Sequence, residues 1–158
     1  MAIVNIRDTG RNSAKTSDVR ALAEKVQKPS DTEAITAANT ITAAESGTRF
    51  VMNTATARIQ TLPSPAAGLE YWFYVGATEP TGSHTIVTAS SANIIVGNVS
   101  SPEDAAGHVA TVTDADTISL VASKAVHGDY AHVWSDGTNW YLDGMCKVQD
   151  GITTTQAS

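Results

Sequence analysis

The chain has 158 residues and a formal net charge of −6, from 10 Lys and Arg residues against 16 Asp and Glu residues. This length fits one domain with an appendage. A domain of about 150 residues buries roughly 68–70% of its unfolded surface, so the chain can form a sizeable core without disulfides. The acidic balance lacks the basic footprint that binding to a nucleic-acid backbone requires. We therefore expect no nucleic-acid partner, and the single cysteine, Cys146, excludes an intramolecular disulfide and a thiolate metal cluster.

No apolar run in the sequence is long enough to span a bilayer, and the first residues lack a signal-peptide core. We expect no membrane partner and no Sec export. Synthesis and folding in the cytoplasm of a host suit a chain that needs no disulfide.

Residues 1–32 are predicted to form an N-terminal arm. The arm begins with a short apolar stretch and continues with a polar, locally basic stretch that has no sustained period. A segment of this kind buries little surface by itself, so it either orders against something else or is a frayed terminus.

Within the arm, residues 18–27 form the one predicted helix. Val19, Leu22, Ala23 and Val26 fall at i, i+3, i+4 and i+7 behind Ser17 as N-cap, and a Lys-Pro pair ends the pattern. A single helix of about ten residues is marginal in water. Its apolar stripe must therefore dock on the rest of the chain, on a neighbouring copy or on another protein.

Residues 33–148 are predicted to form the β-sheet domain. Short runs separated by Gly, Pro and Asp turns indicate strands, and Ile59 is the clearest inward residue of the run at 57–62. Nine or so strands without intervening helices predict a sandwich or barrel rather than a parallel sheet. The predicted runs are 33–42 (one strand or a pair), 48–53, 57–62, 70–76, 84–89, 93–97, 108–112, 116–122, 129–135 and 139–142.

The run at 70–76 is the predicted central strand. Tyr71 and Phe73 point to one face of a pleated strand while Trp72 and Tyr74 point to the other, so both faces need cover. We interpret Trp72 and Tyr74 as core residues, and the alternative is an exposed pair that contacts carbohydrate or protein.

The second aromatic centre is the hairpin at 132–142. Its turn, Asp136-Gly137, is the strongest short-range hairpin signal in the chain. The hairpin carries Trp134 and Trp140, which we interpret as the partner of the central strand in one all-β core. Residues 149–158 are polar and Thr-rich and are set apart as a C-terminal tail.

The order of these signals resembles the small jelly-roll domains of tailed-bacteriophage virion proteins, in particular capsid decoration (cement) proteins. The likeness covers about residues 33–145 and consists of a turn, an aromatic strand, an apolar run and a closing Gly-x-x-Trp hairpin. It is carried by Glu45-Ser46-Gly47-Thr48-Arg49-Phe50, Leu62-Pro63 with Gly68, Tyr71-Trp72-Phe73, Ile94-Ile95-Val96-Gly97, Ile118-Ser119-Leu120, Val133-Trp134 and Gly137-Thr138-Asn139-Trp140.

The resemblance implies a jelly-roll-like β-sandwich, a homotrimer, and a place on the capsid surface of a virion with the major capsid protein as partner. Residues 1–32 match in position the extension that such proteins lay across the capsid. The helix at 18–27 is not required by the likeness. It leaves open whether the arm clamps a capsid, swaps between subunits or connects to a fibre base.

The residues that could support catalysis or metal binding form no constellation. His127 and His132 are five apart, so on a continuous strand they point to opposite faces. The chain has no nucleophile elbow and no Gly-rich phosphate loop. Aspartates beside predicted turns are explained by Asx turns better than by calcium. We therefore expect no catalytic residue, no metal and no cofactor, and hence no enzyme.

Two hypotheses follow for function. The preferred one is a structural protein that binds the outside of a bacteriophage capsid and stabilises the shell. The alternative is a tail-fibre or head-fibre domain that binds host-surface glycans through Trp72, Tyr74 or Trp140. In the preferred hypothesis the apolar residues of the arm contact the capsid or a neighbouring subunit, and these are Ile3, Val4, Ile6, Val19, Leu22 and Val26.

Overall fold

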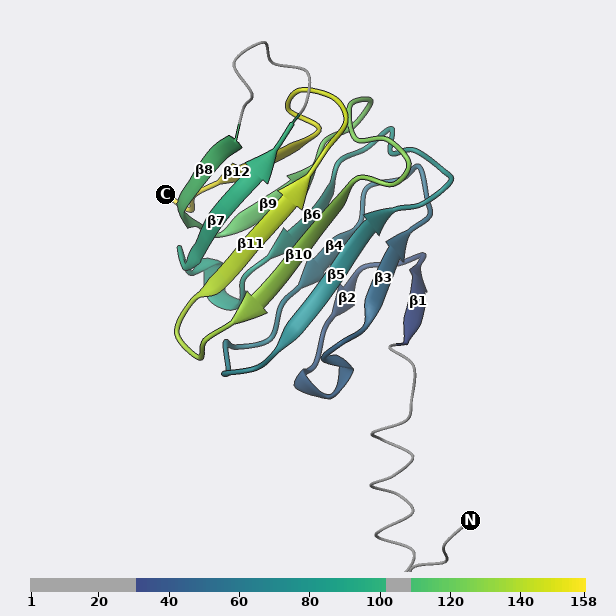
Figure 1. Cartoon of the computed structure of the whole chain (residues 1–158). Coiled ribbons are helices and arrows are strands. Elements are labelled where there is room, and N and C mark those ends of the chain that lie inside the picture. Colours follow the sequence, from purple (N-terminus) through teal and green to yellow (C-terminus); the bar gives the residue numbers. More distant parts are fainter. Residues whose placement is uncertain (1–30, 102–108) are drawn as a thin grey trace, which may run out of the picture.

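The computed structural model describes residues 31–101 and 109–158, which form two β-sheets packed face to face (Figure 1). The predicted all-β sandwich is confirmed. The seven-stranded sheet has the order β1 (Thr32–Ile35), β3 (Arg49–Met52), β5 (Glu70–Val75), β10 (Tyr130–Ser135), β11 (Trp140–Met145), β7 (Ile95–Ser100), β8 (Val109–Ala115). The five-stranded sheet has the order β12 (Ile152–Thr155), β9 (Thr117–Leu120), β6 (His84–Val87), β4 (Ile59–Thr61), β2 (Asn39–Thr40).

The first six strands wind as a coil that alternates between the two sheets. β1, β3 and β5 pair in parallel in one sheet, while β2, β4 and β6 pair in parallel in the other. Two short 3-10 helices, Ala43–Glu45 and Ala89–Ser91, follow β2 and β6. The stretch predicted as one strand or a pair over 33–42 is thus a pair whose members lie in different sheets.

The last strands return as antiparallel pairs beside this coil. β10 pairs with both β5 and β11, and β9 pairs with both β6 and β12. Both sheets therefore contain parallel and antiparallel pairs, and β11 with β7 adds a further parallel pair to the seven-stranded sheet. This mixture differs from the antiparallel pairing of a jelly roll.

The structure corrects the predicted limits of the sheet domain. Residues 149–158, predicted as a separate tail, supply β12, because Ile152 is buried and the strand closes the edge of the five-stranded sheet beside β9. At the other end, β1 starts at Thr32, and the Arg49 N–H donates to the Asp31 carbonyl at 2.8 Å. The predicted helix at 18–27 lies outside the described residues.

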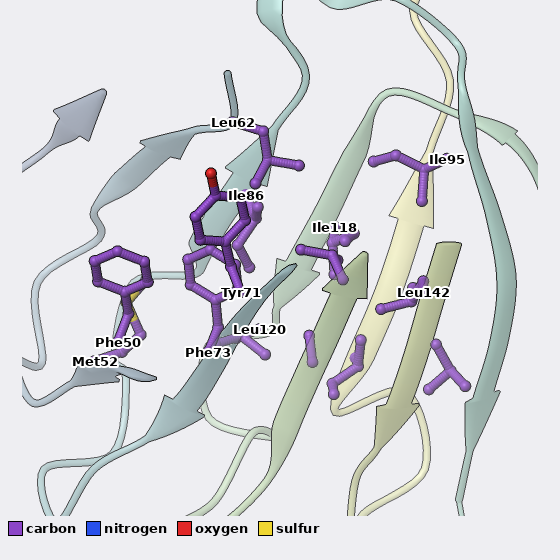
Figure 2. Close-up of a cluster of buried hydrophobic side chains, with 14 of the residues drawn as sticks. Phe50, Met52, Leu62, Tyr71, Phe73, Ile86, Ile95, Ile118, Leu120 and Leu142 are labelled. Carbon is purple, nitrogen blue, oxygen red and sulfur yellow. The ribbon is translucent and has the colours of Figure 1, made fainter. Parts of the chain in front are cut away.

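The core forms where the two sheets face each other (Figure 2). Side chains from β3, β5 and β11 meet those from β6 and β9. Strict alternation along β5 places Tyr71 and Phe73 on one face, as predicted, and buries them together with Val75. Aromatic stacking adds to this burial, because the Phe50 and Phe73 rings lie 5.3 Å apart at 20°.

One inward residue was predicted wrongly. Ile59 is 53% exposed, and its neighbour Gln60 is fully buried instead. The register of β4 against β6 decides this, because Gln60 pairs with the inward Ile86. The Gln60 side-chain N–H donates to the Ala37 carbonyl at 3.1 Å, which satisfies part of a polar group that burial would otherwise leave unpaired.

Buried polar side chains hold the loops to the sheets. His84, which is fully buried, accepts at Nδ1 the backbone N–H of Arg58 at 3.1 Å, and its Nε2 lies 2.9 Å from the Thr54 carbonyl. These two contacts require a neutral ring that carries its proton on Nε2. Desolvation, and more weakly the charge of Arg58, lower the pKa of His84 against the opposing effect of the Thr54 bond.

Candidate functional site

The outer face of the seven-stranded sheet carries the candidate site. Side chains paired across the strands lie on the same face, so the register places three outward rows over the sheet. One row runs Ala34, Val51, Tyr74, Tyr130, Met145, Ser100, Val109. The second runs Thr32, Arg49, Trp72, His132, Asp143, Asn98, Thr111. The third runs Glu70, Trp134, Tyr141, Val96.

We call the ring-bearing part of these rows the aromatic face, which consists of Trp72, Tyr74, Tyr130, His132, Trp134 and Tyr141. At its centre the Trp72 and His132 rings stack at 3.8 Å and 9°. Tyr74 lies parallel to Trp72 at 6.1 Å, and Tyr130 is tilted against both. The rings therefore support one another as a continuous layer on β5 and β10.

A second stack extends the aromatic face onto β11. Trp134 and Tyr141 lie 4.3 Å apart at 13°, and Trp134 is 43% exposed. The Tyr141 hydroxyl donates to Asp136 Oδ2 at 2.9 Å, and the same carboxylate accepts the backbone N–H groups of Thr138 and Asn139. These three bonds lower the pKa of Asp136, so the carboxylate stays charged while it holds the hairpin turn and the Tyr141 ring.

Charged groups border the aromatic face. The carboxylate of Glu70, which is exposed, has Oε2 3.6 Å from His132 Nε2. Asp143 lies beside His132 on β11 and is also exposed. Together with Asp136 they give this side of the sheet three carboxylates, whereas Arg49 is the single Lys or Arg in the three rows.

The structure divides the predicted aromatic contacts. The interpretation of Trp72 and Tyr74 as core residues is wrong. Both side chains are half-buried on the outer face. Trp140 is the reverse case, because it is fully buried with its ring 5.8 Å from Tyr71 in the core. Trp140 therefore offers no surface to a ligand, and Trp134, which we had assigned to the core, is exposed in its place.

Other candidate groups are dispersed. The predicted arm contacts at Ile3, Val4, Ile6, Val19, Leu22 and Val26 lie outside the described residues. In residues 31–101 and 109–158 no three His, Cys, Asp or Glu side chains are grouped to hold a metal ion. Within that same part of the chain, no helix is long and apolar enough to cross a membrane.

A small pocket lies where β7 and β8 approach β12 and the segment between β11 and β12. Its volume is about 80 Å³, and Val99, Cys146 and Ile152 are among its lining residues. Pockets that take small molecules typically measure about 300–1,000 Å³. The pocket suits a packing defect better than a ligand site, and the Cys146 thiol in it faces the Ser100 carbonyl at 3.8 Å.

Sequence reasoning missed Tyr130, His132 and Tyr141 as members of the site. The available signal was strand alternation, which puts Tyr130, His132 and Trp134 on one face of β10. What alternation does not reveal is which face of the strand meets the other sheet.

The chain matches no known protein-family model, no curated protein and no solved structure.

Proposed function

We propose that this chain is a structural protein of a bacteriophage virion, without enzymatic activity. It binds the outside of the capsid as a homo-oligomer, most simply a trimer, with the major capsid protein as partner. The observation that carries the proposal is the aromatic face, a broad sheet surface with half-buried Trp72 and exposed Trp134. In residues 31–101 and 109–158, no strand covers this surface. Surfaces of this kind mark protein contacts.

The distribution of ionisable groups supports a binding role over a catalytic one. Asp129 accepts the backbone N–H groups of Val126 and Lys147, and Asp136 ties its own hairpin turn. These two carboxylates thus hold the backbone of turns and loops. Catalysis needs several such groups converging on one reacting atom.

A mechanism for shell stabilisation follows from oligomer geometry. Pressure from a packaged genome loads the junctions between capsomers. A trimer laid over a junction adds buried area, and three linked contacts bind with far higher avidity than one. The arm residues Ile3, Val4, Ile6, Val19, Leu22 and Val26 contact the capsid or a neighbouring subunit.

Cosedimentation tests this proposal. Full-length protein added to shells assembled from the major capsid protein alone is expected to pellet with them at a saturable ratio. Shells that carry it are expected to withstand a higher temperature than bare shells. Sedimentation equilibrium of the free protein checks the trimer. A monomer that neither pellets with shells nor changes their melting contradicts the proposal.

A second candidate function is binding of host-surface glycans by a fibre domain. The exposed Trp134 ring stacked on Tyr141, with Asp136 beside it, favours this candidate, because flat rings with nearby hydrogen-bonding groups suit sugar rings. A glycan array separates the two functions. Binding that Trp134→Ala abolishes supports the fibre domain, and a uniformly negative array with shell binding supports decoration.

A further inference from the structure

Charge is strongly segregated along this chain. Residues 1–30, which we call the leader, hold six of the ten Lys and Arg residues but three of the sixteen Asp and Glu residues, so their net charge is +3. The remaining 128 residues hold four basic and thirteen acidic residues, a net charge of −9. Two parts of opposite sign joined in one molecule attract each other unless salt screens them.

The aromatic face combines the features that bind a basic peptide. Glu70, Asp136 and Asp143 supply carboxylates around it, and its rings present π surfaces, over which Lys and Arg side chains are attracted. The outward rows also expose large apolar side chains. Within the described residues, the exposed fraction is 54% for Val109, 43% for Trp134 and 41% for Met145.

The leader carries the complementary pattern. Val19, Leu22 and Val26 are spaced as one stripe of a helix, and cationic residues flank them at 20, 25 and 28. An apolar stripe with basic borders matches an apolar surface with acidic borders in both hydrophobicity and charge.

The point of attachment brings the two together. The chain passes from the leader into β1 at Thr32, which is the first residue of the outward row that continues through Arg49 to Trp72. Strands lie about 4.8 Å apart, so Trp72 is roughly 10 Å from this entry point and the whole sheet is about 30 Å wide. Thirty residues span up to about 100 Å when extended, which is ample to cover the face.

We infer that the aromatic face is the docking site of the leader. The basic side chains of the leader lie over the rings and pair with Glu70 and Asp143, while its apolar stripe covers Trp134 and Met145. The inference gives the aromatic face, which supports the capsid proposal as a protein-contact surface, a specific occupant within the homo-oligomer, namely the leader of the same or a neighbouring subunit. It stands whether or not the oligomer binds a capsid.

Tryptophan fluorescence in the full-length chain tests this inference. Trp72 and Trp134 lie on the aromatic face and Trp140 is fully buried, so quenching by acrylamide reports cover over the face. At about 10 mM salt the Debye length is about 30 Å, and at about 1 M it is about 3 Å. Docking is expected to make the Stern–Volmer constant about twofold larger at high salt than at low salt.

Charge exchange provides the specific control. R20E/K25E/K28E in the leader, or E70K/D143K on the face, is expected to raise quenching at low salt about twofold, and the combination of both sets is expected to restore protection. Lys124→Glu is the matched control, because Lys124 is exposed and pairs with Asp150 away from the aromatic face. It is expected to leave quenching unchanged.

Several outcomes decide the matter. Restored protection from acrylamide in the combined variant supports docking. If this protection persists on dilution, the leader docks on its own subunit. If it is lost on dilution, the leader docks on a neighbouring copy. Docking is overturned if quenching changes neither with salt, nor in the leader variant R20E/K25E/K28E, nor in the face variant E70K/D143K. Protection by added oligosaccharides without any leader effect also overturns it and makes a glycan the occupant. A variant that fails to fold exposes Trp140, and the salt measurement on the unaltered chain then decides.

Discussion

The two sheets of this sandwich present opposite kinds of outer surface. Over the five-stranded sheet, one outward row runs Thr153, Ser119, Thr85, Ile59 and the other runs Thr155, Thr117, Val87, Thr61, Thr40. These rows contain neither a charged nor an aromatic side chain. Over the seven-stranded sheet the outward rows hold six rings with carboxylates around them.

The difference distinguishes surface side chains that sheet formation explains from surface side chains that it does not explain. Thr and Val have high strand propensity and suit a pleated, half-buried surface, so the hydroxyl-rich face is accounted for by sheet formation alone. Trp134 at 43% exposure gains little from burial in this structure. A partner that covers the ring would remove this apolar surface from water, and we therefore propose the aromatic face as the functional side of the molecule.

The largest expected effect is on the sheet that carries the aromatic face. Gly97 has φ +144°, and a Cβ built there lies 2.0 Å from the Leu142 carbonyl oxygen, where β7 passes β11. Gly97→Ala is expected to cost about 3 kcal/mol or more in the free energy of unfolding, because the backbone itself must move. Urea denaturation followed by circular dichroism measures this.

Gly68→Ala is the matched control for Gly97→Ala. Gly68 also has a positive φ, +85°, but no atom lies within 4 Å of the added Cβ. A left-handed backbone alone costs about 1–2 kcal/mol for a residue with a side chain. Equal losses in the two variants would show that backbone strain, and not the contact with β11, decides the stability at Gly97.

The second prediction compares the two outer faces directly. Trp72→Ala removes a ring stacked on His132 and Tyr74 and is expected to destabilise the fold by about 2 kcal/mol. Thr85→Ala, the half-buried equivalent on the other sheet, is expected to cost about 0.5 kcal/mol. Paired urea titrations give both values, and a larger loss at Thr85 would reverse the structural ranking of the faces.

The sequence predicts the strands better than their arrangement. Alternation over 70–76 correctly separates Tyr71 from Trp72, because the period of a pleated strand is local. It does not say which side meets the other sheet. Both sides of β5 carry rings, and the prediction therefore places Trp72 in the core. It also places Trp134 in the core with the rest of the hairpin, and the structure has both on the outer face. The hairpin at 132–142 does supply an aromatic anchor to the core, as predicted, and that anchor is the fully buried Trp140.

Sequence patterns also fail to predict the coil of the first six strands, for a different reason. Its parallel pairs join residues such as Phe50 and Phe73, which are far apart in the sequence, so no local pattern predicts their pairing. The same distant register puts Gln60 inward and Ile59 outward. No local preference favours a buried glutamine, so only the tertiary structure determines it.

The third prediction concerns the pH dependence of the five-stranded sheet. Burial lowers the pKa of His84 in the folded chain, whereas the unfolded chain titrates near pH 6.5. Above this value the ring is neutral in both states. As the pH falls below about 6.5, the unfolded chain binds a proton that the folded chain does not, so stability decreases until the lower folded pKa is reached.

Urea titrations between about pH 7.5 and pH 5 measure the His84 effect. In His84→Gln the decline over this window is expected to be smaller, because glutamine does not titrate. His127→Gln is the control, since His127 is exposed in the loop before β10. A decline that His127→Gln removes and His84→Gln leaves intact would place the sensitivity elsewhere.

The smallest expected effect on stability is at Trp134, the most exposed ring of the aromatic face. Trp134→Ser loses one stack with Tyr141, while the bond from the Tyr141 hydroxyl to Asp136 still fixes that ring. We expect a change of about 0.5 kcal/mol in the free energy of unfolding, as for surface substitutions that open no cavity. Partner binding, measured by shell cosedimentation or by protection from acrylamide, is expected to fall several-fold. A loss as large as that of Trp72→Ala, with binding intact, would make Trp134 a structural residue and remove the functional distinction between the two faces.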